Sequence, residues 1–223
     1  MKLSSIQTLV NYRRRDITES FISDTEIREY ANEALRKIHA DYEFAYTKTS
    51  AFFSYTTGGT YKLSSIASDF DEPINLFYGS TYEFIPVSPQ EFYQLSAYNY
   101  NIWAIDNADL LVKTSFGTGT LILNYYSNYV AQTSGGSPLA NLSATTDSPL
   151  MAENDQDIIV DFVAARCFQK EGMVDDYKIA YNDFLNALKR MKNKTPSRKK
   201  HYNKIMTSPR KASNLNLADK SSF

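Results

Sequence analysis

Ser23-Asp24-Thr25-Glu26-Ile27-Arg28-Glu29-Tyr30-Ala31-Asn32-Glu33-Ala34-Leu35 carries the strongest helix pattern in the chain. Ser23 followed three residues later by Glu26 is a capping box, which marks the start of a helix. Apolar residues then recur at spacings of three and four, as they do on a helix that buries one face. The stretch therefore predicts a helix from Asp24 to Asp41.

Three other helices are predicted elsewhere in the sequence. One runs from Ser5 to about Arg14. A second runs from Asp155 to Glu171 and ends at Gly172, because glycine adopts the left-handed conformation that often ends a helix. A third, from Val174 to about Lys192, repeats apolar residues at helical spacing. The short link between the last two predicts an antiparallel pair.

Some side chains on these helices carry their own expectations. Arg166 interrupts an apolar run and is expected to point to solvent or to a partner, whereas Cys167 is expected in the core. His39 is expected to cap its helix or to lie on the surface. The Arg-Arg-Arg run at residues 13–15 is expected at a solvated helix end, where cations complement the helix dipole.

Between residues 44 and 130 the pattern changes to short β-rich runs separated by turn signals. Gly58-Gly59 and Asp106-Asn107 are interpreted as hairpin turns, and residues 117–119 join the last two strands. The predicted strands are Tyr46–Tyr55, Thr60–Leu63, Ile74–Tyr78, Tyr82–Pro86, Asn101–Ile105, Leu110–Thr114 and Thr120–Tyr126. A short helix opens at Ser88. The region is expected to form a small sandwich or a half-open barrel.

The expected fold class is α+β. Residues 1–43 and 151–192 are predicted to form a helical bundle, with the antiparallel β-domain 44–130 inserted between its two parts. Residues 131–150 are interpreted as a long loop or an arm, since they are rich in Ser, Thr, Gly, Ala and Asn. Residues 193–223 are predicted to form an extended basic tail.

The composition argues against several function classes. One Cys and two His leave no disulfide framework and argue against a zinc or haem site. There is no glycine-rich phosphate loop. Three acid clusters, at residues 69–72, 153–157 and 175–176, fall in loops or at helix starts, where acids need no catalytic role. The sequence therefore predicts no enzyme, no cofactor and no metal, and a soluble protein without a signal peptide or membrane span.

Charge is divided unevenly along the chain. Residues 189–223 carry eleven Lys or Arg and one acid, whereas residues 1–188 carry an excess of acids. A basic tail on an acidic body suggests an anionic partner, which is nucleic acid, a neighbouring copy or an acidic protein. A solvated tail is the alternative. We favour an anchor that inserts into a partner protein, because apolar residues are interspersed with the charges. The candidate anchor residues are Arg198, Lys199, Lys200, Tyr202, Lys204, Ile205, Met206, Arg210, Lys211, Leu215, Leu217 and Phe223.

Several local phrases, taken in order, resemble the head-to-tail adaptor (connector) proteins of tailed bacteriophages. The stretch 24–35 is similar to that family's opening helix, and Thr60-Tyr61-Lys62-Leu63 to one of its strand phrases. Residues 103–112 are similar to its central hairpin, 119–126 to its last strand, and 147–150 to the loop that enters the C-terminal helices. The resemblance covers about residues 17–190.

The resemblance implies a non-enzymatic virion protein of the neck, assembled in the host cytoplasm. Family members form a ring, usually of twelve copies, beneath the portal protein. They seal the DNA-filled head, bind the tail or the next neck protein, and leave a channel for the genome without reading its sequence. The chain is then expected to be monomeric or weakly associating in solution. The alternatives are a nucleic-acid-binding protein that uses its tail, and another neck or tail-completion ring protein.

Overall fold

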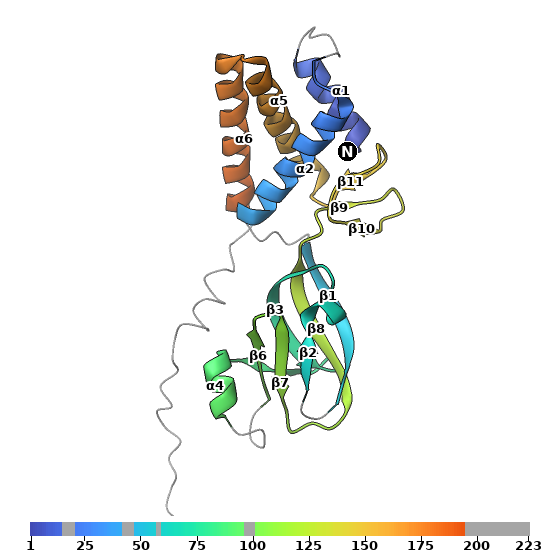
Figure 1. The fold of residues 1–223 in the computed structure, drawn as a ribbon, viewed down its shortest axis with the longest axis vertical. Helices are drawn as coiled ribbons and strands as arrows, with labels where there is room; N and C mark the ends of the chain where they lie inside the picture. Colours follow the sequence, from blue (N-terminus) through green and yellow to red (C-terminus); the bar gives the residue numbers. More distant parts are fainter. Residues whose placement is uncertain (15–20, 42–46, 57–58, 96–100, 195–223) are drawn as a thin grey trace, which may run out of the picture.

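The computed structural model describes residues 1–14, 21–41, 47–56, 59–95 and 101–194. Figure 1 shows the long helices gathered at one end of the molecule and the two larger sheets at the other. The predicted mixed α+β class is confirmed, because six α-helices and antiparallel sheets occur in the described residues.

Four long helices make up the helical end: α1 (Leu3–Arg13), α2 (Asp24–Asp41), α5 (Asp157–Glu171) and α6 (Val174–Lys194). The predicted limits of α2 are confirmed, and so is its capping box. The backbone N–H of Glu26 donates to the Ser23 hydroxyl at 3.3 Å, and the backbone N–H of Ser23 donates to the Glu26 carboxylate at 3.0 Å. Gly172 ends α5 with a φ of 77°, as predicted. The last helix continues two residues beyond its predicted end, into the segment expected to belong to the tail.

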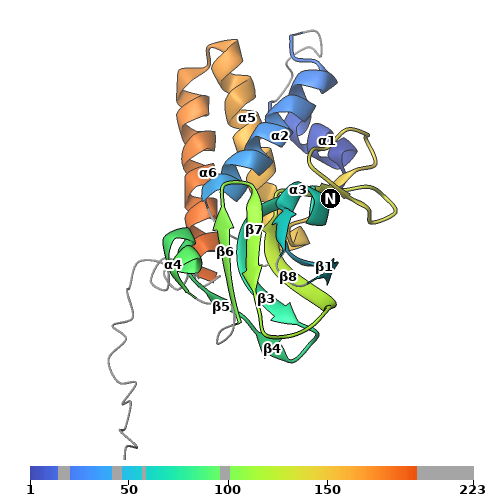
Figure 2. The same ribbon diagram turned by 60° about the horizontal axis from the view of Figure 1, so that its bottom comes forward.

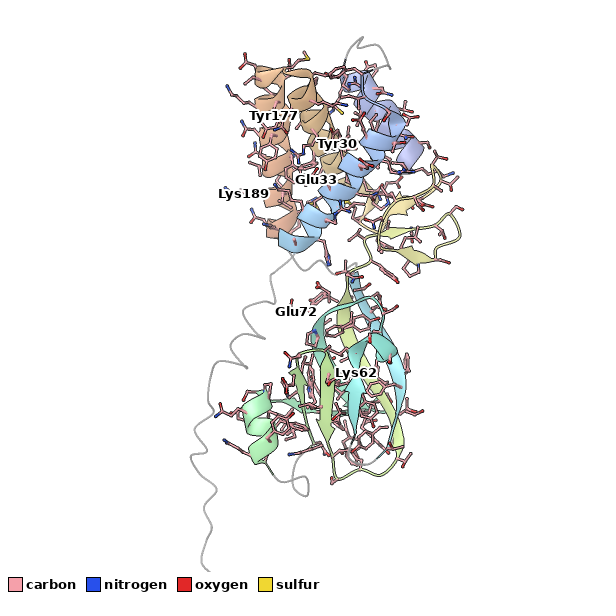
Figure 3. All side chains as sticks on the ribbon, in the orientation of Figure 1. Tyr30, Glu33, Lys62, Glu72, Tyr177 and Lys189 are labelled. Atoms are coloured by element: carbon pink, nitrogen blue, oxygen red, sulfur yellow. The ribbon has the colours of Figure 1, made fainter. Side chains whose placement is uncertain are left out.

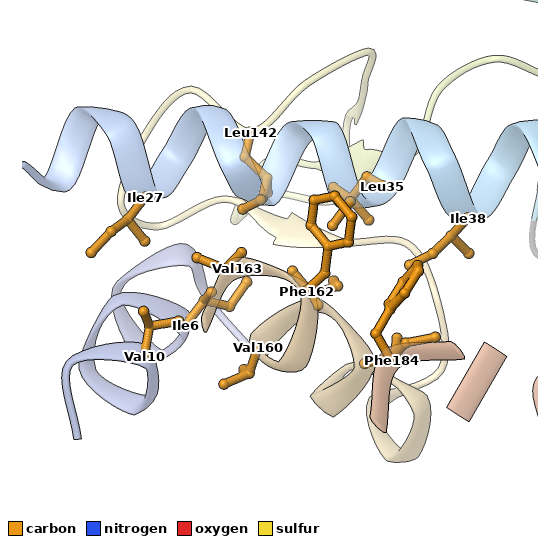
Figure 4. Close-up of a cluster of buried hydrophobic side chains, with 14 of the residues drawn as sticks. Ile6, Val10, Ile27, Leu35, Ile38, Leu142, Val160, Phe162, Val163 and Phe184 are labelled. Carbon is orange, nitrogen blue, oxygen red and sulfur yellow. The ribbon is translucent and has the colours of Figure 1, made fainter. Parts of the chain in front are cut away.

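Helix α5 lies between α1, α2 and α6, and residues 158–165 along it are all buried. An apolar helix surrounded on most sides is the central element of a helical core. Its Phe162 meets Phe184 of α6 edge to face, with ring centroids 5.0 Å apart. Figure 4 shows these rings beside side chains from α1 and α2. Cys167 is fully buried here, as predicted.

The other end of the molecule holds two four-stranded sheets. The first has the order β1 (Lys48–Tyr55), β8 (Gly119–Ser127), β3 (Phe70–Tyr78), β4 (Tyr82–Glu83). The second has the order β2 (Thr60–Lys62), β7 (Asp109–Lys113), β6 (Ile102–Asp106), β5 (Ile85–Pro86), and β5 runs parallel to β6. The short helices α3 (Leu63–Ile66) and α4 (Pro89–Gln94) accompany them (Figure 2).

The two sheets share one core. Leu76, Leu121 and Leu123 of the first sheet and Trp103 and Val112 of the second belong to the same buried cluster. Buried residues alternate with less buried ones along β8, as expected for a strand with one face toward a core. Of the two predicted arrangements, the packed sheets resemble the sandwich.

One of the predicted hairpins is wrong. Strands β1 and β2 flank Gly58-Gly59 in the sequence, but β1 pairs with β8 and β2 pairs with β7, so the chain passes from one sheet to the other between Tyr55 and Thr60. Residues 117–119 likewise connect strands of different sheets. The turn at Asp106-Asn107 is confirmed, since β6 and β7 pair there and Asn107 has a φ of 56°.

Residues 131–150, interpreted as a long loop or an arm, include short paired strands. They contain β9 (Ala131–Gln132), β10 (Pro138–Leu139) and β11 (Ser148–Pro149), which form a small three-stranded sheet. Leu142 is buried in the helical core. Its backbone N–H donates to the Asn32 side-chain carbonyl at 2.7 Å, and the Asn32 amide donates back to its carbonyl at 3.0 Å. Turn residues and the apolar side chains of Ala131, Leu139 and Leu142 thus fix a segment whose composition is typical of a loop.

Two side chains make contacts that the sequence did not indicate. His39 is not on the surface: its side chain is 13% exposed, and its Nε2 lies 3.3 Å from a carboxylate oxygen of Asp71 on β3. The Arg166 side chain is 36% exposed, and it pairs with Glu33 of α2 and lies over the Phe162 ring, 5.7 Å from its centroid. Both are tertiary contacts that a local sequence pattern cannot indicate.

Candidate partner-binding groove between α1 and α6

All twelve residues predicted to form the anchor lie between 198 and 223, outside the described residues. What the structure describes is the helix that leads to them. The last two turns of α6 carry Lys189, Arg190, Lys192 and Lys194. Lys194 Nζ donates to the Asp155 carboxylate at 2.9 Å, so the beginning of the basic segment is held beside the entrance to α5.

An open groove runs along α5, with α1 on one side and α6 on the other. It consists of three adjoining hollows of about 370, 600 and 500 Å³. Asp161 and Arg190 line both the first and the second hollow, and Arg13 and Asp183 line both the second and the third. The shared residues make the three hollows one continuous surface, which is open and elongated as a protein-binding surface is.

The middle of the groove is charged. Arg13 of α1 pairs with Asp161 of α5, and Asp161 is only 8% exposed whereas the Arg13 side chain is 44% exposed. Burial raises the pKa of Asp161, and the Arg13 guanidinium opposes that rise. Lys189 and Arg190 add positive charge from α6, while Asp183 adds negative charge. A surface with both signs of charge fits a partner with a matching charge pattern.

One end of the groove is apolar. Phe168, Met173 and Ile179 line it together with Ala164 and Ala180. Ile179 is 63% exposed and Met173 is 38% exposed. An exposed apolar patch with charged residues around it is typical of an interaction site.

Arg14 corrects the expectation of a solvated helix end. Its side chain is 2% exposed and pairs with Glu171 of α5 at 2.6 Å. Of the arginine run, Arg14 is buried at the wall of the third hollow and Arg13 is partly exposed in the groove, while Arg15 lies outside the described residues. The repeat of arginines was one sequence signal for this site. Asp161, the one acid inside an apolar helix pattern, was a second signal that sequence reasoning missed.

The opposite face of the helical end carries half-buried tyrosines. Figure 3 labels Tyr30 and Glu33 on α2 and Tyr177 on α6. Tyr177 stacks on Tyr181, with ring centroids 5.6 Å apart, and Lys37 Nζ donates to the Tyr181 hydroxyl at 3.0 Å. Tyrosines that are partly exposed and held in place are frequent at protein interfaces.

The acid cluster at residues 69–72 makes structural contacts, whereas Asp155 and Asp157 of the second cluster line the first hollow of the groove. The Asp69 carboxylate accepts hydrogen bonds from the Tyr125 hydroxyl at 2.7 Å and the Ser127 hydroxyl at 2.6 Å. Burial, together with this carboxylate, raises the pKa of Tyr125. Within the described residues, no group of three or more His, Cys, Asp or Glu side chains could hold a metal ion. Burial raises the pKa of the Cys167 thiol to about 12.

Among the described helices, none combines the length and the apolar character that a membrane crossing requires. Comparison with models of known protein families gives no match for this chain, and comparison with curated proteins gives none either.

Proposed function

We propose that this chain is a structural virion protein, a head-to-tail adaptor of a tailed bacteriophage, and not an enzyme. Copies of it form a ring beneath the portal, which seals the DNA-filled head and presents a surface to the tail or to the next neck protein. The proposal rests on the ordered sequence resemblance over residues 17–190. The single structural observation that supports it is the open, charged groove between α1 and α6.

In this proposal the helical end is a bundle into which the β-domain is inserted, and its long helices build the ring. A ring contact joins two different surfaces of neighbouring copies. The groove and the tyrosine-bearing face formed by α2 and α6 are two such surfaces on different sides of α5. Charged residues in the groove set the register between copies, and the exposed Ile179 and Met173 supply apolar contact.

In this proposal, the acidic body and the basic tail have different roles in the ring. The acidic body lines a channel that repels DNA phosphates, so the genome slides through without sequence-specific contacts. The basic segment that starts in the last turns of α6 continues into the tail, which anchors the ring to the portal. Lys194 at the end of α6 is paired with Asp155, so the tail leaves the helical end from a fixed point.

Electron microscopy of the protein mixed with the portal of the same phage tests this function. A ring stacked on the portal is the expected result. Replacing Arg198, Lys199 and Lys200 with Gln should then weaken binding to the purified portal. Lys62→Gln is a matched control, because Lys62 is an exposed cation on β2, far along the chain from the tail. Unchanged portal binding of the triple variant would refute the anchor, and the absence of any portal complex would refute the adaptor function.

The second candidate is a nucleic-acid-binding protein, and the cluster of four cations on the last turns of α6 favours it. Such a protein would bind DNA as the free chain, with an affinity that falls steeply as salt rises. A DNA titration at two salt concentrations separates the two functions, because an adaptor binds the portal strongly and DNA weakly. Another neck or tail-completion ring protein would bind a tail component instead of the portal.

A further inference from the structure

The outer face of the first sheet carries an apolar row. Phe52 of β1 lies opposite Ile122 of β8, and Ile122 lies opposite Phe77 of β3. Phe52 is 69% exposed, and Ile122 and Phe77 are partly exposed. The outer face of an antiparallel sheet is normally polar. The next row, Ser50, Asn124 and Asn75, follows that rule and is joined by hydrogen bonds.

The apolar row ends at an unprotected strand edge. Strand β1 pairs with β8 along its whole length without a bulge, and it has no strand on its other side among the described residues. Residues 49–54 make no further backbone hydrogen bond with the part of the chain that the structure describes, and none of them is charged or a proline. The short helix α3 lies beside β1 but forms no hydrogen bond with it. A strand edge is usually protected by charges, prolines, bulges or a covering helix or loop, and β1 has no charge, proline or bulge between these residues.

The other sheet edges do carry such protection. The second edge of this sheet is β4, which has two residues and includes Glu83. The edges of the other large sheet are β2, with three residues and Lys62, and β5, with two residues and Pro86. None of them is long enough to pair with the eight residues of β1. Of the edges that the structure describes, only the β1 edge of a second copy equals β1 in length and offers an uncharged stretch like residues 49–54.

We propose that two copies of this chain pair through β1, antiparallel and centred on Phe52. The pairing places Phe52 opposite Phe52 of the second copy and Ser50 opposite its Ser54. Lys48 then lies opposite an uncharged Thr56, so no like charges meet. The two-fold axis is perpendicular to the sheet, so the apolar rows of the two copies lie on the same face and meet at the phenylalanine pair. Cross-strand aromatic pairs are among the contacts that stabilise joined strands.

This contact is separate from the proposed ring. A two-fold contact closes on two copies, whereas a ring requires two different surfaces. The pairing uses the end of the molecule that holds the two large sheets, and the groove is at the helical end (Figure 1). The inference therefore describes the free chain in solution and holds whether or not the adaptor function is correct.

Sedimentation equilibrium over a range of protein concentrations tests the pairing. The full chain should show a monomer–dimer equilibrium, and Phe52→Lys should raise its dissociation constant by about tenfold or more, because two lysines would face each other. Ile85→Lys is the matched control, since Ile85 is 52% exposed and lies on an edge strand of the other sheet. Its dissociation constant should equal that of the unaltered chain. Circular dichroism checks that both variants are folded.

A mixture of two variants makes the test specific to the two-fold axis. Phe52→Lys and Phe52→Glu should each be monomeric alone, and an equal mixture should form a heterodimer through the opposite charges. A monomeric unaltered chain at every concentration would overturn the proposal, whatever else β1 binds. A dimer that Phe52→Lys leaves intact, or that Ile85→Lys disrupts equally, would also overturn it.

Discussion

Arg14 and Glu171 form an ion pair in which both side chains are almost fully buried, with exposed fractions of 2% and 6%. The Arg14 Nε and Nη2 atoms donate to the same carboxylate oxygen at 3.0 and 2.6 Å. This pair joins the end of α1 to the end of α5. Removing one partner of a buried pair leaves a charge without compensation, which is costly.

We therefore expect Glu171→Gln to lower the free energy of unfolding by about 3 kcal/mol or more. Urea denaturation followed by circular dichroism measures the change. Glu153→Gln is the control, because the Glu153 side chain is 87% exposed and its loss should cost less than about 0.5 kcal/mol. Equal losses in the two variants would show that burial of the Arg14 charge is not what makes Glu171 important.

We expect loss of Arg13 and loss of Asp161, which form the ion pair in the groove, to lower the free energy of unfolding by different amounts. Asp161 is 8% exposed, and the Arg13 side chain is 44% exposed. Arg13→Met leaves a buried carboxylate without its cation, whereas Asp161→Asn leaves an arginine that water can still solvate. Arg13→Met should therefore lower the free energy of unfolding by more than Asp161→Asn does, by about 1–3 kcal/mol at neutral pH.

The pH dependence of the Arg13 variant follows from the raised pKa of Asp161. The pKa of Asp161 in the folded chain is above the ordinary 3.8, so protonation of Asp161 favours folding. The contribution of the protonated carboxyl to stability is fully present below pH 3.8 and is lost as the pH rises through the folded pKa. The deficit of Arg13→Met should accordingly shrink as the pH falls from 7 toward 4. A deficit that stays constant with pH would mean that lost packing, not the carboxylate charge, is responsible.

The contribution of Glu26 to stability is expected to have the opposite pH dependence. Its hydrogen bond with Lys170 and that with the Ser23 backbone lower its pKa from 4.5 to about 2. Because its pKa is lowered in the folded chain, the Glu26 carboxylate contributes stability above pH 4.5, and that contribution is lost as the pH falls toward 2. Glu26→Gln should lower the melting temperature at pH 7, and the difference from the unaltered chain should disappear over this window. Glu29→Gln, an exposed change on the same helix, should show no such trend.

Local patterns predicted the helices well, because their signals lie within a few residues of each other. The capping box and the spacing of Ile27, Ala31 and Leu35 determine where α2 begins and which face it buries. The same applies to Gly172, whose left-handed conformation is a property of one residue. The turn at Asp106-Asn107 was predictable for the same reason.

Contacts between distant residues could not be predicted in this way. Nothing near Gly58 indicates that β1 pairs with β8, some seventy residues later, and not with β2. Asp161 and Arg13 are 148 positions apart, and their meeting depends on how α1 packs on α5. The groove therefore became visible only in the folded chain, although its charged residues are plain in the sequence.

Ile179 provides a test of whether the groove is the surface used in assembly. It is 63% exposed, lines the apolar end of the groove, and lies on the same helix as Leu185, which is 43% exposed and outside the groove lining. Ile179→Asp should leave the free energy of unfolding within about 0.5 kcal/mol of the unaltered chain, because the side chain is already in water.

If the proposed ring uses the groove, the effect of Ile179→Asp on assembly should be much larger, because a carboxylate in a contact between copies loses its water without gaining a partner. Rings counted on the portal by electron microscopy should become at least about tenfold fewer for Ile179→Asp, and should be unchanged for Leu185→Asp. If both variants assembled normally, the ring contact would lie elsewhere on the helical end. The tyrosine-bearing face would then be the next surface to alter, beginning with Tyr177→Asp, because Tyr177 is only partly buried against Tyr181.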